Sequence, residues 1–201
     1  MNQEWTVVGE FMTDDNFTSY SGERFNDILQ TPAVAIHLLE DDGAIPNNQK
    51  LPLLVYKAAL NLPGQNQAAT VEALFRANGW GGSWRNGIYS FHHYHSTAHE
   101  VLAVCRGSAR VQLGGEKGPI FSVGPGDVIL IPAGVGHKNL GASADFLAVG
   151  AYPPGQSWDM NYGKAGERPT ADQNIGQVPL PQTDPLFGSR GPLIDHWFRQ
   201  G

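Results

Sequence analysis

The segment from Gly87 to Tyr152 constrains the fold of this chain more than any other feature. Short runs of alternating or β-branched apolar residues recur there, at 88–95, 100–105, 109–113, 120–123, 128–131 and 146–152. The turns between them are rich in Gly and Pro, as at 114–118, 124–127 and 132–134. Six short strands at close spacing with turn signals are typical of a β-sandwich or a small barrel. The sequence therefore predicts an all-β domain.

The chain before this segment adds two predicted strands and one predicted helix. Apolar runs at 33–39 and 51–60 predict strands, and Pro52 favours an edge position for the second, because proline cannot donate to a ladder. Apolar residues at i, i+3 and i+4 predict a helix over 67–78. Residues 80–87 are rich in Gly and Trp, and we expect a loop there, either packed or serving as a lid over the barrel mouth.

Three segments follow from this pattern. Residues 1–31 are polar and irregular and are expected to form an N-terminal arm with a little helix. Residues 32–152 hold the β-barrel together with the preceding strands and helix. Residues 153–201 lack periodicity and are expected to wrap the outside as extended segments. Because there is no internal repeat, the chain predicts one barrel and not two.

Composition and charge exclude several classes of function. The chain has 201 residues, of which 41% are hydrophobic, which is enough for a packed core. A net charge of −6 provides no basic footprint for nucleic acid and no polybasic run for a membrane surface. No apolar stretch approaches the length of a membrane span, and the first residues do not resemble a secretory signal. The single cysteine, Cys105, excludes an intramolecular disulfide, so a cytoplasmic protein is expected.

A cluster of histidines indicates a metal site. On a strand, His93 and His95 would project from the same face about 7 Å apart, which suits a two-ligand chelate. Glu100 opens the next apolar run and can turn back into the same cavity, with His99 as its rival. His137, from the turn that begins at Pro132, is a fourth candidate.

Three imidazoles and one carboxylate suit a divalent transition metal (Fe, Mn, Ni, Co or Zn) more than Ca²⁺ or Cu⁺. On an octahedral metal, four protein ligands leave two positions for water, substrate or dioxygen. Zinc could instead be closed into a structural site. By strand parity, His92 and His99 are expected to face outward, where either could meet a dimer partner.

Two segments resemble the paired motifs of the cupin superfamily. The first motif, G-x5-H-x-H-x3,4-E-x6-G, is matched at every fixed position by Gly87, His93, His95, Glu100 and Gly107. The second, G-x5-P-x-G-x2-H-x3-N, is matched by Gly126, Pro132, Gly134 and His137, but Gly141 stands where the family has Asn. Phrases such as DDGAIPNN, NGIYSFHHYHSTAHE and VGAYPPGQSWDMNYGK are similar to the single-domain YjlB-type bacterial cupins, over about residues 36–195.

The resemblance implies a single jelly-roll cupin barrel with one short helix and extended arms. It also implies that His93, His95, Glu100 and His137 are the metal ligands. Jelly rolls leave sheet edges that need cover, so a homodimer is expected, held near the N-terminal arm. Tyr89 shares the predicted parity of His93, and core packing is its expected role. If Tyr89 lines the cavity instead, it is the first candidate for a catalytic acid or base.

Two functions remain open at this point. The first is a metal-dependent enzyme acting on a small organic substrate in the barrel, with a dioxygenase-like oxidoreductase favoured over a Lewis-acid isomerase or lyase. The alternative is a non-catalytic module that binds or senses a small metabolite or a metal. An accessible metal beside a titratable group would favour the enzyme, and an enclosed or absent metal would favour the module.

Overall fold

The computed structural model describes residues 6–7 and 25–198, so most of the predicted N-terminal arm lies outside the described residues. The strands are β1 (Thr6–Val7), β2 (Ala33–His37), β3 (Leu53–Lys57), β4 (Gly81–Asn86), β5 (Glu100–Arg106), β6 (Ala109–Leu113), β7 (Ile120–Val123), β8 (Val128–Ile131), β9 (His137–Ala142) and β10 (Leu147–Tyr152). The helices are α1 (Gln67–Ala77), α2 (Thr170–Ile175) and α3 (Pro192–Trp197). None of the helices in this described part is long and apolar enough to cross a membrane.

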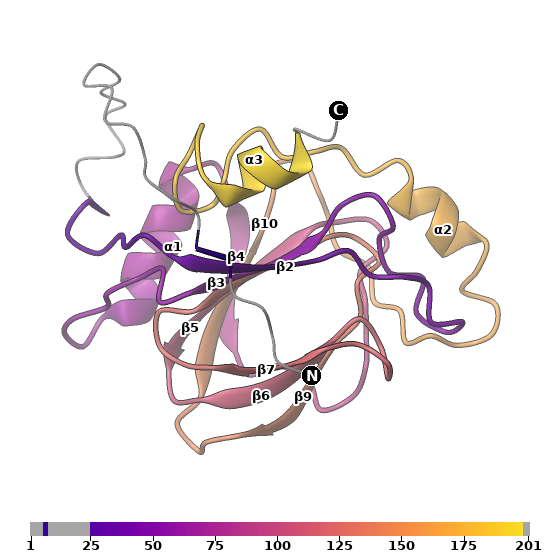
Figure 1. Ribbon diagram of the computed structural model, residues 1–201, viewed down its shortest axis with the longest axis horizontal. Helices are drawn as coiled ribbons and strands as arrows, with labels where there is room; N and C mark the ends of the chain where they lie inside the picture. Colours follow the sequence, from indigo (N-terminus) through magenta and orange to yellow (C-terminus); the bar gives the residue numbers. More distant parts are fainter. Residues whose placement is uncertain (1–5, 8–24, 199–201) are drawn as a thin grey trace.

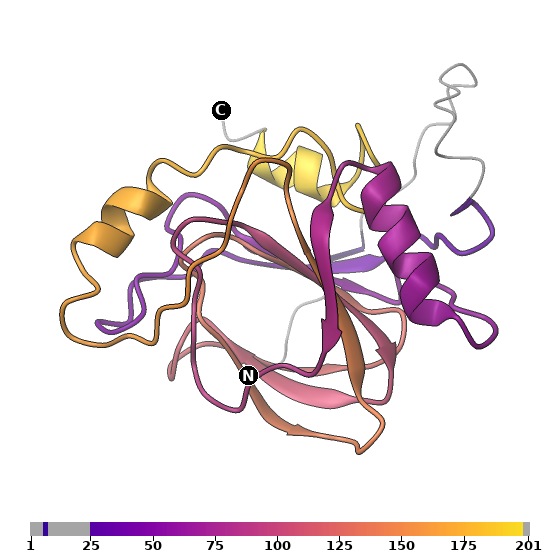
Figure 2. The same ribbon diagram turned by 180° about the vertical axis from the view of Figure 1, so that it is seen from behind.

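The strands form two antiparallel sheets that enclose a barrel (Figures 1 and 2). The large sheet has the order β1-β2-β3-β8-β5-β10-β4, and the small sheet has the order β7-β6-β9. Helices α1 and α3 lie over the outer face of the large sheet, away from the small one (Figure 1). The fold is the expected all-β jelly roll, and the helix predicted over 67–78 is confirmed as α1.

Strand β5 shows how the sequence directs two cores. Its residues Val101, Ala103 and Cys105 pack into the outer core between the large sheet and the helices. The alternate residues Leu102 and Val104 pack into the core between the two sheets. Because both faces are buried, the strand reads as a continuous apolar run. Its first residue, Glu100, points to the same inner side of the sheet as Leu102 and Val104.

Two local predictions next to each other in the sequence are wrong. The predicted loop at 80–87 contains β4, which pairs with β10. The predicted strand at 88–95 is irregular and makes only isolated bridges there, His93 with His137 and Tyr94 with Asn161. A glycine-rich segment gives no strand signal, yet its backbone can still complete a sheet edge. Gly150 opposite makes this possible, since a Cβ there would lie 2.2 Å from the Trp84 ring.

Three further differences concern sheet edges and segment ends. Strand β3 lies inside the large sheet between β2 and β8, so its predicted edge position is wrong. Pro52 precedes β3 and removes no ladder hydrogen bond from it. Strand β9 was not predicted, because its sequence HKNLGA is mostly polar. The C-terminal segment is not wholly extended, since it contains α2 and α3.

Asp184 anchors this C-terminal segment to the barrel. It is fully buried, and its carboxylate accepts a hydrogen bond from the Tyr56 hydroxyl of β3 at 2.8 Å. It also accepts from three backbone N–H groups, those of Leu186, Phe187 and Leu193, at 2.8–3.1 Å. One side chain therefore ties the loop before α3, and α3 itself, to the large sheet.

Replacing Asp184 with alanine is expected to lower the free energy of unfolding by about 3–5 kcal/mol, because it leaves a buried hydroxyl and three buried N–H groups without partners. Urea unfolding followed by tryptophan fluorescence measures the loss. Asp27→Ala, at an exposed position, is the control and should change stability by less than about 0.5 kcal/mol. A loss under about 1 kcal/mol in Asp184→Ala would contradict the anchoring role.

Asp184 also predicts a pH dependence of stability. Burial raises its pKa from 3.8 to about 6, against the opposing effect of its hydrogen bonds. Between about pH 4 and pH 6 the native state then binds more protons than the unfolded state, so this group's contribution to stability falls as pH rises. Asp184→Asn lacks the titration. The stability of the wild type relative to this variant should therefore fall by about 2.4 kcal/mol from pH 4 to pH 7, and a constant difference would show that the carboxyl does not titrate there.

Candidate metal centre

Four side chains predicted as metal ligands lie together inside the barrel. His93, His95 and His137 each offer one ligand atom, and these atoms lie within 4.8 Å of one another. All three residues are buried, and the ring centroids of His93 and His137 are 3.9 Å apart. Glu100 Oε2 is 3.4 Å from Nε2 of His95 and 3.4 Å from Nε2 of His137. The structure thus brings together residues that are up to 44 positions apart in the printed sequence.

Backbone pairing sets the direction of each of these side chains. Glu100 begins β5 on the inner face of the large sheet, and His137 begins β9 in the small sheet. His93 forms an antiparallel bridge with His137, and the adjacent Tyr94 forms one with Asn161. The two bridges hold the chain extended here, so His93 and His95 point to the same side although they are not in a regular strand.

Each imidazole is also held by its second nitrogen. The Nδ1 atoms of His93, His95 and His137 face the backbone carbonyls of Phe91, Asp159 and Val135, respectively. A carbonyl can only accept, so each Nδ1 carries a proton, and in the neutral ring Nε2 keeps its lone pair. Metal-binding histidines in proteins are typically oriented in this way by a hydrogen bond from the other ring nitrogen.

Burial and charge favour an ionised carboxylate at Glu100 and a neutral imidazole at His93. Burial alone would raise the pKa of Glu100, but His137 and His95 outweigh it and hold that pKa well below its usual range. Burial, together with the neighbouring His137 and His95, lowers the pKa of His93 to about 3. Burial also acts to lower the pKa of His95, but Glu100 and Asp159 raise it overall. The buried Glu100 carboxylate is therefore stable only with a positive charge next to it.

This donor set fits a divalent cation. Among the described residues, Glu100 Oε2 is a buried oxygen with no hydrogen-bond partner, and its 3.4 Å separations from the two Nε2 atoms exceed an ordinary N–H···O distance. Three nitrogens and one carboxylate oxygen around one point suit Fe, Mn, Ni, Co or Zn. A bound cation would satisfy the oxygen and replace the proton that otherwise compensates its charge.

A cavity of about 390 Å³ opens directly onto this cluster. Its walls come from β4 and the segment after it, from β5, β9 and β10, and from the C-terminal segment: Gly82, Trp84, Arg85, Asn86, Gly87, Ile88, Tyr89, His93, His95, Glu100, Leu102, His137, Tyr152, Trp158 and Met160. Trp84 Nε1 donates to the Tyr152 hydroxyl at 2.9 Å. Burial raises the pKa of Tyr152, and the nearby Glu100 carboxylate raises it further, so this hydroxyl keeps its proton.

Tyr89 lies at this cavity and not in the core, so its expected core packing is wrong. It is 49% exposed, and its ring meets the His93 ring edge-on at 5.2 Å. Phe91 is 44% exposed and stacks on Tyr89. The strand alternation used for Tyr89 does not apply, because 88–91 is not a strand.

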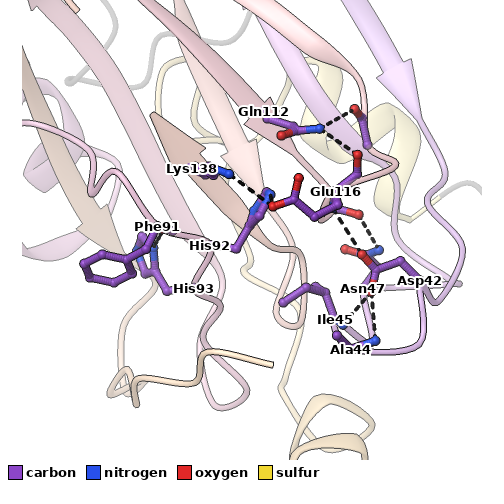
Figure 3. A network of polar contacts seen from close by, with 12 residues as sticks. Asp42, Ala44, Ile45, Asn47, Phe91, His92, His93, Gln112, Glu116 and Lys138 are labelled. Atoms are coloured by element: carbon purple, nitrogen blue, oxygen red, sulfur yellow. Dashed lines mark hydrogen bonds and ion pairs between the residues drawn. The ribbon is translucent and has the colours of Figure 1, made fainter. Parts of the chain in front are cut away.

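The other two clustered histidines are not solvent-facing, which corrects a second expectation. The side chain of His92 is only 10% exposed and points away from His93 toward Glu116 and Lys138, with Nε2 3.5 Å from Glu116 Oε1 (Figure 3). His99 is buried against Trp197 of the outer core, and its Nδ1 accepts from the Ala133 N–H. His99 is therefore not a ligand rival for position 100.

The C-terminal segment supplies site residues that the sequence reasoning missed. Asp159 accepts from the His95 ring through its carbonyl. Its carboxylate accepts from Ser96 N and Oγ, from Thr97 N and from Asn161 Nδ2. Trp158 and Met160, on either side of it, line the cavity. No local periodicity marks this contact, because it joins residues more than 60 positions apart.

Comparison with known proteins places these residues in a described domain. Residues 85–149 match the family model described as "Cupin domain", which spans all four clustered side chains. The chain is 44% identical over 163 residues to the "Uncharacterized protein YjlB" of Bacillus subtilis (strain 168), covering 81% of this chain and 96% of that protein.

The similarity to solved structures is low, both in sequence identity and in TM-score. Acireductone dioxygenase from Bacillus anthracis, described with a cadmium ion in its active centre, is 16% identical with a TM-score of 0.36, over 64% of this chain and 83% of that one. Procruciferin, an 11S globulin from Brassica napus, is 18% identical with a TM-score of 0.33, over 65% of this chain and 27% of that one.

Asp159 is expected to be a positioning residue for His95. Asp159→Ala removes the carboxylate that fixes the carbonyl facing His95, so affinity for Co²⁺ should fall about 10- to 100-fold, with a changed visible spectrum of the bound ion. Asp159→Asn keeps part of the acceptor set and should lose less.

Asp145→Ala, in an exposed turn away from the cluster, is the matched control and should leave Co²⁺ affinity unchanged. An Asp159→Ala protein that binds Co²⁺ with wild-type affinity and spectrum would show that Asp159 only holds the segment in place.

Proposed function

The chain belongs to the cupin family that includes the YjlB protein of Bacillus subtilis, and on this premise we propose that it is a metal-dependent enzyme acting on a small organic molecule inside the barrel. One observation carries the proposal: the buried cluster of three histidines and one glutamate forms a wall of an open cavity. A purely structural metal would be enclosed by its ligands, whereas ligands that face a cavity leave positions for a substrate.

The residues have separate roles in this proposal. His93, His95, His137 and Glu100 hold Fe, Mn, Ni, Co or Zn, with the three Nδ1–H groups and the carbonyls behind them fixing the ring directions. The metal supplies Lewis-acid or redox chemistry when bound, and a dioxygenase-like oxidoreductase is favoured over an isomerase or lyase.

Two tyrosine hydroxyls at the cavity wall have different roles in proton transfer. Tyr89, half-exposed beside His93, is placed to give a proton to the substrate or take one from it. Tyr152 keeps its hydroxyl protonated and is fixed by Trp84, so it can orient a bound oxygen atom without exchanging its proton. The apolar side chains Leu102, Ile88 and Met160 reduce the water around the reacting atoms.

A homodimer in the cytoplasm remains a prediction for the assembly and location of this protein. In the described part, the small sheet ends in β7 and β9, whose outer edges have no strand partner. Such edges call for cover, which a second copy would provide. Nucleic acid is not a proposed partner, because the net charge of −6 opposes it.

Substituting the proposed ligands is expected to abolish metal binding while the barrel stays folded. Protein purified anaerobically without chelator should contain close to one equivalent of metal by elemental analysis. His93→Ala or His137→Ala should retain less than about a tenth of it, and Glu100→Gln should weaken binding without abolishing it. His92→Ala is the control, because this neighbouring histidine points away from the cluster.

Circular dichroism on the same samples separates metal loss from unfolding. Metal below a tenth of an equivalent in the wild type, even after reconstitution, would contradict the proposal. Metal that binds and a small molecule that binds to it, without turnover of any oxygen-dependent or hydrolytic substrate tested, would support the alternative of a sensing module.

A further inference from the structure

We propose that the substrate of this cavity is a planar aromatic molecule, neutral or singly charged, whose ring lies against Trp158 and Tyr89 while its oxygen atoms reach the metal. The inference rests on the proposed function and narrows it to a substrate class.

The charge of the wall excludes strongly anionic substrates. Of the described residues that line the cavity, Arg85 is the one Lys or Arg. Its guanidinium is already engaged by both carboxylate oxygens of Glu72, through Nε and Nη2 at 2.7 Å each. Glu100 adds a negative charge at the base of the cavity. A phosphate ester or a dicarboxylate would find no free cation except the metal, so a neutral or singly charged ligand fits better.

The exposed rings indicate what the rest of the ligand is. Trp158 is 51% exposed and Tyr89 is 49% exposed, although both line the cavity. Half-exposed large apolar side chains at a concave site are typical of ligand binding, because a bound ligand buries the apolar surface that is otherwise exposed to water. Leu38 is also exposed, but it does not line the cavity.

The geometry places these rings next to the metal ligands. The Trp158 ring lies 5.6 Å from the His95 ring, and the Tyr89 ring lies 5.2 Å from the His93 ring. Each exposed ring therefore contacts a different proposed ligand. A molecule that occupies the cavity in front of His93 and His95 would therefore lie close to both rings.

The aromatic nature of the exposed side chains favours a flat ligand over a merely apolar one. Trp158, Tyr152 and Tyr89 all line the cavity, and Trp158 and Tyr89 each lie beside a further aromatic ring, Tyr152 at 6.3 Å and Phe91 at 4.9 Å between centroids. Aromatic rings are therefore present next to both His93 and His95. Such rings pack best against another planar π system, in an offset or edge-on arrangement.

Three hydroxamates test the proposal, because they share one metal-chelating group and differ only in what is attached. Benzohydroxamate carries a planar ring, cyclohexanecarbohydroxamate carries a ring of similar size that is not planar, and acetohydroxamate carries a methyl group. Titration of the Co²⁺-loaded protein, followed by visible absorption, should give benzohydroxamate an affinity about tenfold above acetohydroxamate and several-fold above the cyclohexane analogue.

Substitution of the rings should remove this preference. Trp158→Ala and, separately, Tyr89→Ala should each bring benzohydroxamate to within about threefold of acetohydroxamate, while acetohydroxamate affinity changes less than about twofold. Leu38→Ala, at an exposed apolar position away from the cavity, should change neither affinity.

The outcomes separate this inference from the proposed function. Equal affinities for the three hydroxamates in the wild type, or a preference that survives both ring substitutions, would overturn the aromatic substrate class while leaving the metal site intact. If Co²⁺ does not bind at all, acetohydroxamate gives no spectral change, and it is the metal site itself that fails.

Discussion

The buried carboxylate of Glu100 is the constraint on which the site depends. It begins the strand at the centre of the large sheet, between β8 and β10, where its backbone pairs with Ile131. A buried ionised group without compensation costs several kcal/mol, so the fold must supply a positive charge beside it. Two imidazoles at 3.4 Å do so only when protonated, and a divalent cation does so without a proton.

The second requirement is that the histidines reach Glu100 from separate parts of the chain. His137 arrives from the small sheet, and the segment with His93 and His95 is fixed on one side by His137 and on the other by Asn161 of the C-terminal segment. That segment is itself tied to the large sheet by the hydrogen bond from Tyr56 to Asp184, and Asp184 also accepts from three backbone N–H groups of the segment. The outer core is therefore part of the support of the site, and the C-terminal segment is more than a cover.

Sequence reasoning predicted the fold class and three of the four clustered side chains from strong local patterns, whereas His137 depended mainly on the resemblance to the second cupin motif. Alternation and Gly- or Pro-containing turns define most strands of the barrel, and the i, i+2 spacing of His93 and His95 needs only an extended backbone. That spacing held although the predicted strand at 88–95 is irregular, since two isolated bridges keep residues 93–95 extended. Strand β4 and the contacts of Asp159 were missed because they depend on partners distant in the sequence, which no local pattern reveals.

The proposed ligands and the aromatic rings beside them differ in how far the fold fixes them. The ligand imidazoles are buried, and each is held by a backbone carbonyl, so their positions are set when the barrel folds. Tyr89 and Trp158 belong to irregular segments and keep about half of their surface in water. That surface offers hydrophobic free energy that folding has not used, at about 25 cal/mol per Å² of apolar area. A ligand that covers both rings can use it for binding, whereas a smaller ligand held only by the metal cannot, so selectivity in this barrel would come from the rim and reactivity from the base.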